Sequence, residues 1–423
     1  FSWWMTNMMH NFGDEVSNNG VDWVNFSVNQ AGINNTPRYN PSVYEVSITD
    51  IAAGEDSVYF RFYQVAQSHY YWMIDDIQVY QPVDFDLRII DHWIDYAHKE
   101  IETTDSSMEG KMCSVIPQNV PYYSIQKIVG TTATLVNYGT QTLTDVITTT
   151  VFKKDGMEAA SISSPPYSAI SSGDTAYINY VEEVQLEKDI SSIGNYQCET
   201  FISSVEHPYD WNKANALYNF NVTSNLYGYS NPEHVSSGAI SPFDYPDAAD
   251  GDGVGIIVML DPPLVNLPGT DIPAPHVAMG VNVFIPRNYW NDIMWEDGQV
   301  PYLTAEVVEG EIDADGYHFD LEEWPLGHSS AMPVDSSYSG KWKYLQFDSE
   351  VSVNITPSNM GSQYLVIVRM VTGGRRFSLG TDRYTKPSYY SSWYVLGNSF
   401  SLSPSLSNIA MELVVNSYGT SSY

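Results

Sequence analysis

The sequence predicts an all-β fold made of β-sandwich domains in tandem. Short runs rich in Val, Ile, Tyr and Thr, many of them alternating apolar and polar residues, recur about every ten residues. Turn clusters such as Asn-Gly and Asp-Gly separate these runs and supply the positive φ angles that tight hairpins need. We therefore expect strands at residues 22–28, 57–63, 71–80, 131–137, 145–152, 176–184, 196–203, 255–260, 277–285, 303–308, 363–371 and 411–416.

Residues 92–101 are the one segment with a helical pattern. Trp93, Ile94, Ala97 and Ile101 recur at the spacing of an amphipathic helix. A twisted strand is the alternative interpretation of the same residues. With this exception, the chain has the sequence pattern of β-sandwich domains.

The chain of 423 residues is long enough for two or three domains, and two breaks divide it. Pro82 interrupts a strand pattern, and a polar run at residues 229–232 follows another strand. The expected segments are residues 1–82, 83–227 and 228–423. The first segment is too short for a closed sandwich, so we expect it to be the C-terminal part of a domain whose start is missing.

Acidic residues outnumber basic ones by 51 to 18, which gives a formal net charge of −33 without any acidic tail. A chain this acidic is not expected to bind nucleic acid through its phosphates, and anionic membrane surfaces repel it. No stretch approaches the ~20 apolar residues of a membrane-spanning helix. An acidic surface suits a salty or calcium-bearing extracellular medium, where screening reduces self-repulsion. Solubility alone is the alternative explanation.

Two motifs in the first segment resemble a known module. Residues 16–23 read V-S-N-N-G-V-D-W, a strand, a tight turn and a second strand, and residues 72–79 read W-M-I-D-D-I-Q-V. Together they resemble the jelly-roll "cleaved adhesin" modules, related to MAM domains, of surface proteins secreted by Bacteroidetes. The resemblance implies that residues 1–82 are the C-terminal part of a jelly roll.

Motifs in the other two segments resemble the modules that accompany such jelly rolls. N-Y-G-T at residues 137–140, G-D-T at residues 173–175 and G-N-Y at residues 194–196 are similar to Ig-like modules. Residues 341–347, 364–368 and 409–416 resemble the β-sandwich that often closes these arrays. The resemblance implies type IX secretion and an extracellular or cell-surface location. Such proteins usually carry a C-terminal sorting domain, and none is visible after residue 416. Many are adhesins or non-catalytic arms of secreted proteases.

Three acidic clusters are candidate calcium sites, because oxygen-rich turns with glycine favour hard cations. In the resembling jelly rolls, the region of the first cluster commonly ligates calcium. The alternatives are carboxylates bonded to backbone amides in the first cluster and solvent-exposed acidic turns in the other two. The clusters are Asp75 with Asp76; Asp247, Asp250 and Asp252; and Asp313 with Asp315.

Aromatic residues in turn-rich stretches form a second kind of candidate site. Trp290, Trp295 and Trp324 lie beside carboxylates, an arrangement that suits sugar stacking or a protein interface. The alternative is that these rings fold back onto the ends of a sandwich. The adjacent Arg375 and Arg376 stand out in a chain poor in bases. They could meet an acidic neighbour, or protect a strand edge.

Two further predictions concern covalent chemistry. Asp56-Ser57-Val58 and Asp174-Thr175-Ala176 fit the O-glycosylation pattern of the resembling phylum, which makes Ser57 and Thr175 candidate modification sites. Cys113 and Cys198 are the two cysteines, and they could form one disulfide in an oxidising compartment. Two buried thiols are the alternative.

Signals for catalysis are poor, so we expect no enzymatic activity. No H-E-x-x-H motif is present, and G-H-S-S-A at residues 327–331 lacks the final glycine of a nucleophile elbow. The predicted function is a non-catalytic adhesin or extracellular structural protein that binds other surface proteins, glycans or copies of itself. One alternative is a subunit of an extracellular filament or sheath, completed by strand addition. Another is an accessory region of a secreted protease or glycosidase.

Overall fold

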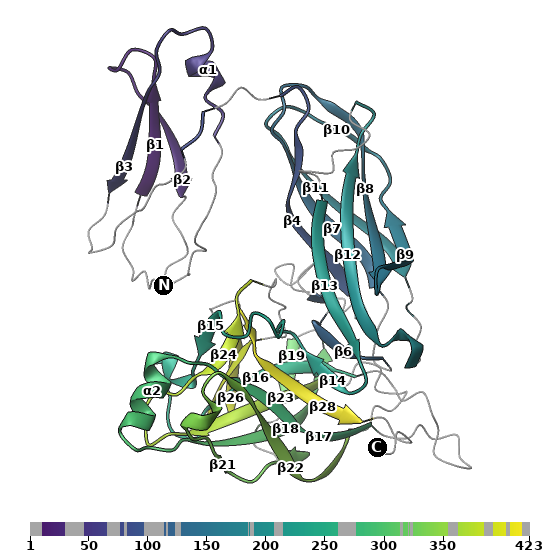
Figure 1. Ribbon diagram of the computed structural model, residues 1–423, viewed down its shortest axis with the longest axis vertical. Helices are drawn as coiled ribbons and strands as arrows, with labels where there is room; N and C mark the ends of the chain where they lie inside the picture. Colours follow the sequence, from purple (N-terminus) through teal and green to yellow (C-terminus); the bar gives the residue numbers. More distant parts are fainter. Residues whose placement is uncertain are drawn as a thin grey trace. The chain divides into compact units, whose positions relative to one another are not determined.

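The computed structural model shows a chain made of strands, and it confirms the predicted all-β class (Figure 1). Several separate sheets and two α-helices make up the described parts, and no helix among them is both long and apolar enough to cross a membrane. The chain separates into two compact units, Phe1–Val83 and Asp84–Tyr423. The structure describes residues 11–29, 46–65, 77–79, 83–96, 114–115, 117–122, 128–184, 186, 190–206, 215–260, 276–313, 316–319, 321, 325–353, 363–384, 392–402 and 407–416.

The first unit holds a three-stranded antiparallel sheet in the order β2-β1-β3. The predicted Asn-Gly turn joins β1 to β2: the Asn19 side-chain oxygen accepts from the backbone N–H groups of Val21 and Asp22, both at 2.8 Å. Gly20 takes a φ of +72°, which glycine adopts without strain. Of the strand expected at residues 71–80, only residues 77–79 are described. The elements are β1 (Asn11–Ser17), β2 (Val24–Asn29), α1 (Thr49–Ala52) and β3 (Tyr59–Val65).

The second unit begins with two facing sheets around an apolar core. One sheet has the order β11-β7-β4-β5, and strands β10, β8, β12 and β13 begin the other. Leu135, Val146, Ile178 and Ile202 lie in the core between them. The strands are β4 (Leu87–Tyr96), β5 (Ser114–Val115), β6 (Asn119–Pro121), β7 (Ile128–Asn137), β8 (Leu143–Lys154), β9 (Met157–Ser163), β10 (Tyr167–Ile170), β11 (Thr175–Val184), β12 (Gly194–Ser203) and β13 (Asn215–Thr223).

The helix predicted from residue 92 is wrong where the structure describes it, because residues 92–96 belong to strand β4. This strand pairs with β7, so that Ile94 lies opposite Thr131 and is fully buried. Ile94 is buried because strand β4 contributes it to the hydrophobic core. The twisted-strand alternative holds for these residues.

Asn137 and Gly139 explain why the N-Y-G-T motif ends a strand. Asn137 is fully buried, and its side-chain amide donates to the carbonyl oxygens of Gln141 (2.8 Å) and Ile170 (3.0 Å). Its side-chain oxygen accepts from the Gly139 N–H at 2.9 Å. The Gly173 N–H of the G-D-T turn donates to the Asn137 carbonyl at 2.8 Å. The two motifs are therefore parts of one corner.

The C-terminal part of the second unit is also layered. Strands β6, β14, β28, β17 and β22 continue the sheet that contains β8, β12 and β13, and another sheet has the order β19-β18-β23-β16-β25-β26. The elements are β14 (Leu226–Gly228), β15 (Gly238–Ile240), β16 (Gly253–Met259), β17 (His276–Ile285), α2 (Tyr289–Glu296), β18 (Tyr302–Asp313), β19 (Gly316–Phe319), β20 (Gly327–His328), β21 (Met332–Pro333), β22 (Lys341–Val353), β23 (Gln363–Val371), β24 (Leu379–Asp382), β25 (Trp393–Leu396), β26 (Ser399–Leu402), β27 (Asn408–Ile409) and β28 (Met411–Asn416).

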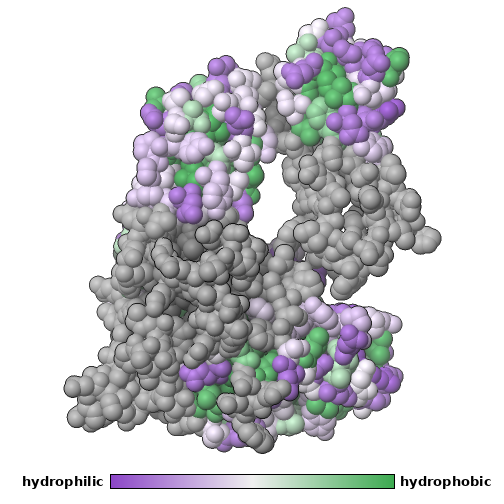
Figure 2. All heavy atoms as spheres, turned by 180° about the vertical axis from the view of Figure 1, so that it is seen from behind, coloured by the Kyte–Doolittle hydropathy of each residue, from purple (hydrophilic) through white to green (hydrophobic). Residues whose placement is uncertain are grey.

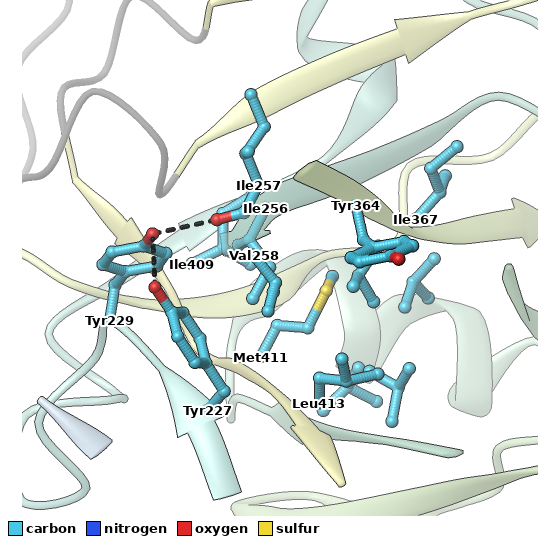
Figure 3. Close-up of a cluster of buried hydrophobic side chains, with 14 of the residues drawn as sticks. Tyr227, Tyr229, Ile256, Ile257, Val258, Tyr364, Ile367, Ile409, Met411 and Leu413 are labelled. Atoms are coloured by element: carbon cyan, nitrogen blue, oxygen red, sulfur yellow. Dashed lines mark hydrogen bonds between the residues drawn. The ribbon is translucent and has the colours of Figure 1, made fainter. Parts of the chain in front are cut away.

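Aliphatic and aromatic side chains from both layers fill this core (Figure 3). Strand β16 lies between β23 and β25, and its residues Ile256, Ile257 and Val258 are fully buried. The Tyr229 hydroxyl donates to the Ile257 carbonyl at 2.9 Å, so this buried phenol does not lose a hydrogen bond. Apolar burial is the main stabilising contribution to this core.

One ten-stranded sheet runs through both parts of the second unit. β13 pairs with β6, β6 with β14, and β14 with β28. The boundary predicted between residues 227 and 228 lies inside β14. The two parts of residues 84–423 therefore share backbone hydrogen bonds, and this agrees with their grouping into a single unit.

Candidate functional site

Two exposed aromatic side chains project from helix α2. Tyr289 is 69% exposed and Trp290 is 43% exposed. Their ring centroids lie 5.4 Å apart and the ring planes meet at 70°. We call this pair the aromatic corner. Large exposed rings supply much of the binding energy at recognition surfaces, so the corner is the leading candidate site.

Polar side chains hold helix α2 in place. The Asn288 side-chain oxygen caps the helix by accepting from the Asn291 N–H at 2.9 Å. Asn291 is fully buried, accepts from the Ser378 N–H at 3.0 Å and donates to the Ser378 carbonyl at 3.1 Å. Met294 packs into the core. The corner therefore stands on a helix fixed to the sandwich.

Arg376 covers one face of the Trp290 ring. Its guanidinium carbon lies 5.0 Å from the centre of the indole, within the range of a cation–π contact. Arg376 also forms an ion pair with Asp244, whose carboxylate accepts from the Ser241 N–H at 3.0 Å. Burial raises the pKa of Asp244, although Arg376 acts in the opposite direction. The guanidinium that contacts the indole is therefore itself held in place by a partly buried ion pair.

The neighbouring arginine is neutralised in the same way. Arg375 forms an ion pair with Asp297, just beyond the end of α2. Both arginines follow the end of β23, so neither lies on a strand edge. Each forms an ion pair with an acidic residue of the same chain. Exposed carboxylates of Asp292 and Glu296 lie on the same helix as the corner. The surroundings of the aromatic corner are consequently polar and ionic.

The three tryptophans predicted as ligand contacts have different environments. Trp290 is exposed, as a ligand contact requires. Trp295 is partly buried: its indole N–H donates to the Val334 carbonyl at 3.1 Å and its ring packs edge-on against Phe377. We therefore leave Trp295 out of the corner. Trp324 lies outside the described residues.

Sequence reasoning placed these aromatics in turns and missed helix α2. The available signal was Asn288, a good N-cap residue immediately before the aromatic pair. Neither Asp244 nor its pairing with Arg376 had a signal, because the two residues are far apart in the sequence. On the face shown in Figure 2, hydrophobic residues lie among hydrophilic ones.

The carboxylates of Asp250 and Asp252 bind backbone amides. Asp250 Oδ1 accepts from the N–H groups of Thr372 (2.9 Å) and Gly374 (3.0 Å). Asp252 accepts from Ala249 (2.7 Å) and Gly397 (2.7 Å) through its two oxygens. Asp247 is exposed. The turn therefore ties together two distant loops.

Replacing Asp250 with alanine is expected to lower the free energy of unfolding by about 1–2 kcal/mol, because the Thr372 and Gly374 amides lose their acceptor. Partial burial acts to raise the pKa of Asp250, but these hydrogen bonds outweigh it and lower the pKa. The contribution is therefore present above the pKa of the unfolded chain and is lost as pH falls through the folded pKa. Urea denaturation at neutral and acidic pH measures it.

The matched control for that experiment is Asp250→Asn, which keeps an acceptor oxygen and removes the charge. It should cost less than Asp250→Ala at neutral pH and should lack the acid-dependent loss. If Asp250→Ala were as stable as the wild-type protein, the amide bonds would not stabilise the fold.

The other two acidic clusters are only partly described. Asp313 ends strand β18, while Asp75, Asp76 and Asp315 lie outside the described residues. Among the described residues, no three His, Cys, Asp or Glu side chains converge into a metal-binding group. Calcium binding at all three clusters stays a prediction.

The residues proposed for covalent chemistry are placed as follows. Ser57 precedes β3 and Thr175 begins β11, and both side chains are exposed. Cys198 on β12 is a buried free thiol, and burial raises its pKa far above the ordinary value. Cys113 lies outside the described residues. The exposed hydroxyls suit modification, whereas a thiol with so high a pKa is unreactive.

The G-H-S-S-A segment is structural where it is described. Ser329 is 2% exposed, and its hydroxyl oxygen accepts from the Ala305 N–H at 2.8 Å. His328 instead lies near Asp348, with an N···O distance of 3.5 Å, on the exposed surface. Ser329 is thus bonded into the sheet and does not face solvent as a nucleophile would.

Comparisons with known proteins do not identify a family. No protein-family model matches the chain, and no curated protein matches it. A solved structure of an exo-chitosanase from Amycolatopsis orientalis, in complex with PNP-beta-D-glucosamine, aligns with 13% identity and a TM-score of 0.17. The alignment covers 64% of this chain and 25% of that one. A score this low carries no argument about fold or function.

Proposed function

We propose that this protein is a non-catalytic extracellular binding protein, an adhesin or a structural surface protein, and that the aromatic corner is its recognition site. The observation that carries the proposal is Trp290, whose indole is 43% exposed while Arg376 holds one of its faces. A ring fixed in this way loses little entropy when a ligand binds.

The electrostatics support an extracellular setting. The net charge of −33 is tolerated where salt or divalent cations screen it. The resemblance to type IX-secreted surface proteins of Bacteroidetes supports the same location. Binding rather than catalysis is proposed because Ser329, in the loose nucleophile-elbow motif, is buried and bonded to the backbone. The expected partners are glycans or other surface proteins.

Trp290→Ala is expected to weaken adhesion to glycan-coated or cell surfaces by about 10- to 100-fold, because a large desolvated ring is lost from the contact. Flow cytometry with the fluorescently labelled protein, together with a glycan array, measures the loss. Tyr177→Ala is the matched control, since Tyr177 is 56% exposed on β11, away from the corner in sequence. Equal binding by the two variants would refute the corner as the recognition site.

Calcium is proposed as a structural ion at the clusters that the structure does not fully describe, Asp75 with Asp76 and Asp313 with Asp315. If a calcium ion stabilises the fold, EGTA should lower the thermal midpoint and added calcium should restore it. Differential scanning calorimetry with and without EGTA makes the measurement. An unchanged midpoint would remove calcium from the account.

A filament or sheath subunit is the second candidate, and strand β3 favours it. β3 pairs with β1 along one edge, and no described strand pairs with its other edge. Phe60 and Phe62 on this strand are 40% and 38% exposed. A sheet edge can accept a strand from a neighbouring copy, which is how such a subunit would assemble. Negative-stain microscopy tests it: ordered filaments would support assembly, and dispersed particles alone would count against it.

A further inference from the structure

The two rings of the aromatic corner do not form a flat platform. Tyr289 and Trp290 meet at 70° with centroids 5.4 Å apart. The flat face of an insoluble polysaccharide would need nearly coplanar rings to contact both at once. An angled pair instead encloses a single ring on two sides. The shape of the corner therefore suits one sugar unit rather than an extended polymer surface.

One face of Trp290 is already occupied, which limits the ligand further. Arg376 lies 5.0 Å from the indole centre, so only the other face and the Tyr289 ring remain for a partner. A cationic ligand stacked on the free face would be repelled by the guanidinium across the ring. This disfavours amino sugars with a free ammonium group.

Anionic ligands are disfavoured by the rest of the molecule. Two arginines near the corner are paired, Arg375 with Asp297 and Arg376 with Asp244. Exposed Asp292 and Glu296 lie on the same helix, and the chain as a whole carries −33. A uronic acid or sulfated sugar would meet this like charge. Arg287, two residues before Tyr289, is also exposed, so an anionic probe tests whether it attracts such a sugar.

A protein partner fits this surface less well than a sugar. Stable protein interfaces bury about 800 Å² on each side, and their centres are depleted of charge. Here two rings stand among two ion pairs and two free carboxylates. Sugar hydroxyls can hydrogen-bond with such groups while a C–H face stacks on an aromatic ring. A small ligand with both kinds of surface matches the corner.

We propose that the aromatic corner binds the terminal ring of an uncharged glycan chain, held in the angle that the Tyr289 ring makes with the Trp290 ring. The inference rests on the proposed function, because it names the ligand class of the same site. End recognition predicts that affinity depends on the last sugar and hardly on chain length.

Isothermal titration with defined oligosaccharides tests the proposal. The probes are trimers and hexamers of uncharged gluco-, manno-, xylo- and galacto-oligosaccharides, trigalacturonate, the chitosan trimer and microcrystalline cellulose. We expect an uncharged series to bind, with trimer and hexamer dissociation constants within about twofold. Tyr289→Ala and Trp290→Ala should each weaken binding by about tenfold or more, Trp290→Phe should recover part of it, and Tyr177→Ala should change nothing.

Each of the other possible outcomes would overturn a stated part of the proposal. The claim that the ligand is an uncharged terminal ring would be overturned by any of three results. These are preference for trigalacturonate or the chitosan trimer, affinity that grows steeply with chain length, and binding to cellulose alone. Loss on Trp290→Ala without loss on Tyr289→Ala would overturn the two-ring corner. If no sugar binds but Trp290→Ala still abolishes adhesion to cells, the ligand is a protein and the recognition surface stands. If Trp290→Ala changes neither sugar binding nor adhesion to cells, both the proposed function and this inference are wrong.

Discussion

Gly139→Ala is expected to destabilise the second unit by about 3 kcal/mol, at the upper end of what overpacking costs. A Cβ at this position would lie 2.6 Å from the Asp84 carbonyl oxygen, 2.7 Å from the Asp86 nitrogen and 2.9 Å from the Phe85 Cα. All three atoms belong to the backbone, so no side chain can rotate away to relieve the clash. The chain leading into β4 would have to move away from the corner formed by Asn137.

Urea denaturation followed by circular dichroism measures this loss. Gly156→Ala is the matched control: Gly156 sits in the hairpin turn between β8 and β9 with φ +84°, and a Cβ added there would have no atom within 4 Å. Its cost is backbone strain alone, about 1 kcal/mol. If Gly139→Ala cost no more than Gly156→Ala, the close approach to residues 84–86 would not stabilise the fold.

The strands were predictable where pattern and turn chemistry agreed. Strands β23 and β28 begin and end at the predicted residues, because a glycine pair follows the first and the apolar run of the second is compact. Helix α2 was missed because an eight-residue element contains too few turns to show a helical period. The helix predicted from residue 92 failed where it is described because a short apolar pattern allows both conformations, and pairing of β4 with β7 selects the strand.

The candidate site was only partly predictable. Trp290 is conspicuous in the sequence, and the structure leaves it exposed. Its support from Arg376 and Asp244 depends on tertiary pairing, and so does the binding of Asp250 to amides 122 and 124 residues away. Such pairings have no local signal, because loops that meet at the end of a sandwich are separated in the chain by whole strands.

Glu412 is the second position where a large effect is expected. It lies on β28, is 5% exposed, and accepts from the side-chain amides of Asn119 (3.0 Å) and Asn282 (3.3 Å). Asn119 in turn accepts from Asn221 at 3.1 Å. This row of polar side chains crosses the sheet where the two parts of the second unit join. Glu412→Ala should cost about 2–3 kcal/mol at acidic pH, because it leaves buried amides without an acceptor.

Glu412→Gln should behave differently, because burial raises the pKa of Glu412 and the Asn282 amide only partly opposes this. A raised pKa means that the folded state binds the proton more tightly than the unfolded chain does. The stability contributed by the proton is then full below the unfolded pKa and is lost as pH rises through the folded pKa. Glutamine carries no charge at any pH, so the variant should lack this loss.

Unfolding free energies measured from pH 4 to pH 8 separate these cases. Relative to the glutamine variant, the wild-type protein should lose stability as pH rises. By pH 8 the variant should be the more stable by about 1 kcal/mol, because it has no buried charge that only neutral groups solvate. Parallel curves for the two proteins would mean that Glu412 titrates as an ordinary exposed carboxyl.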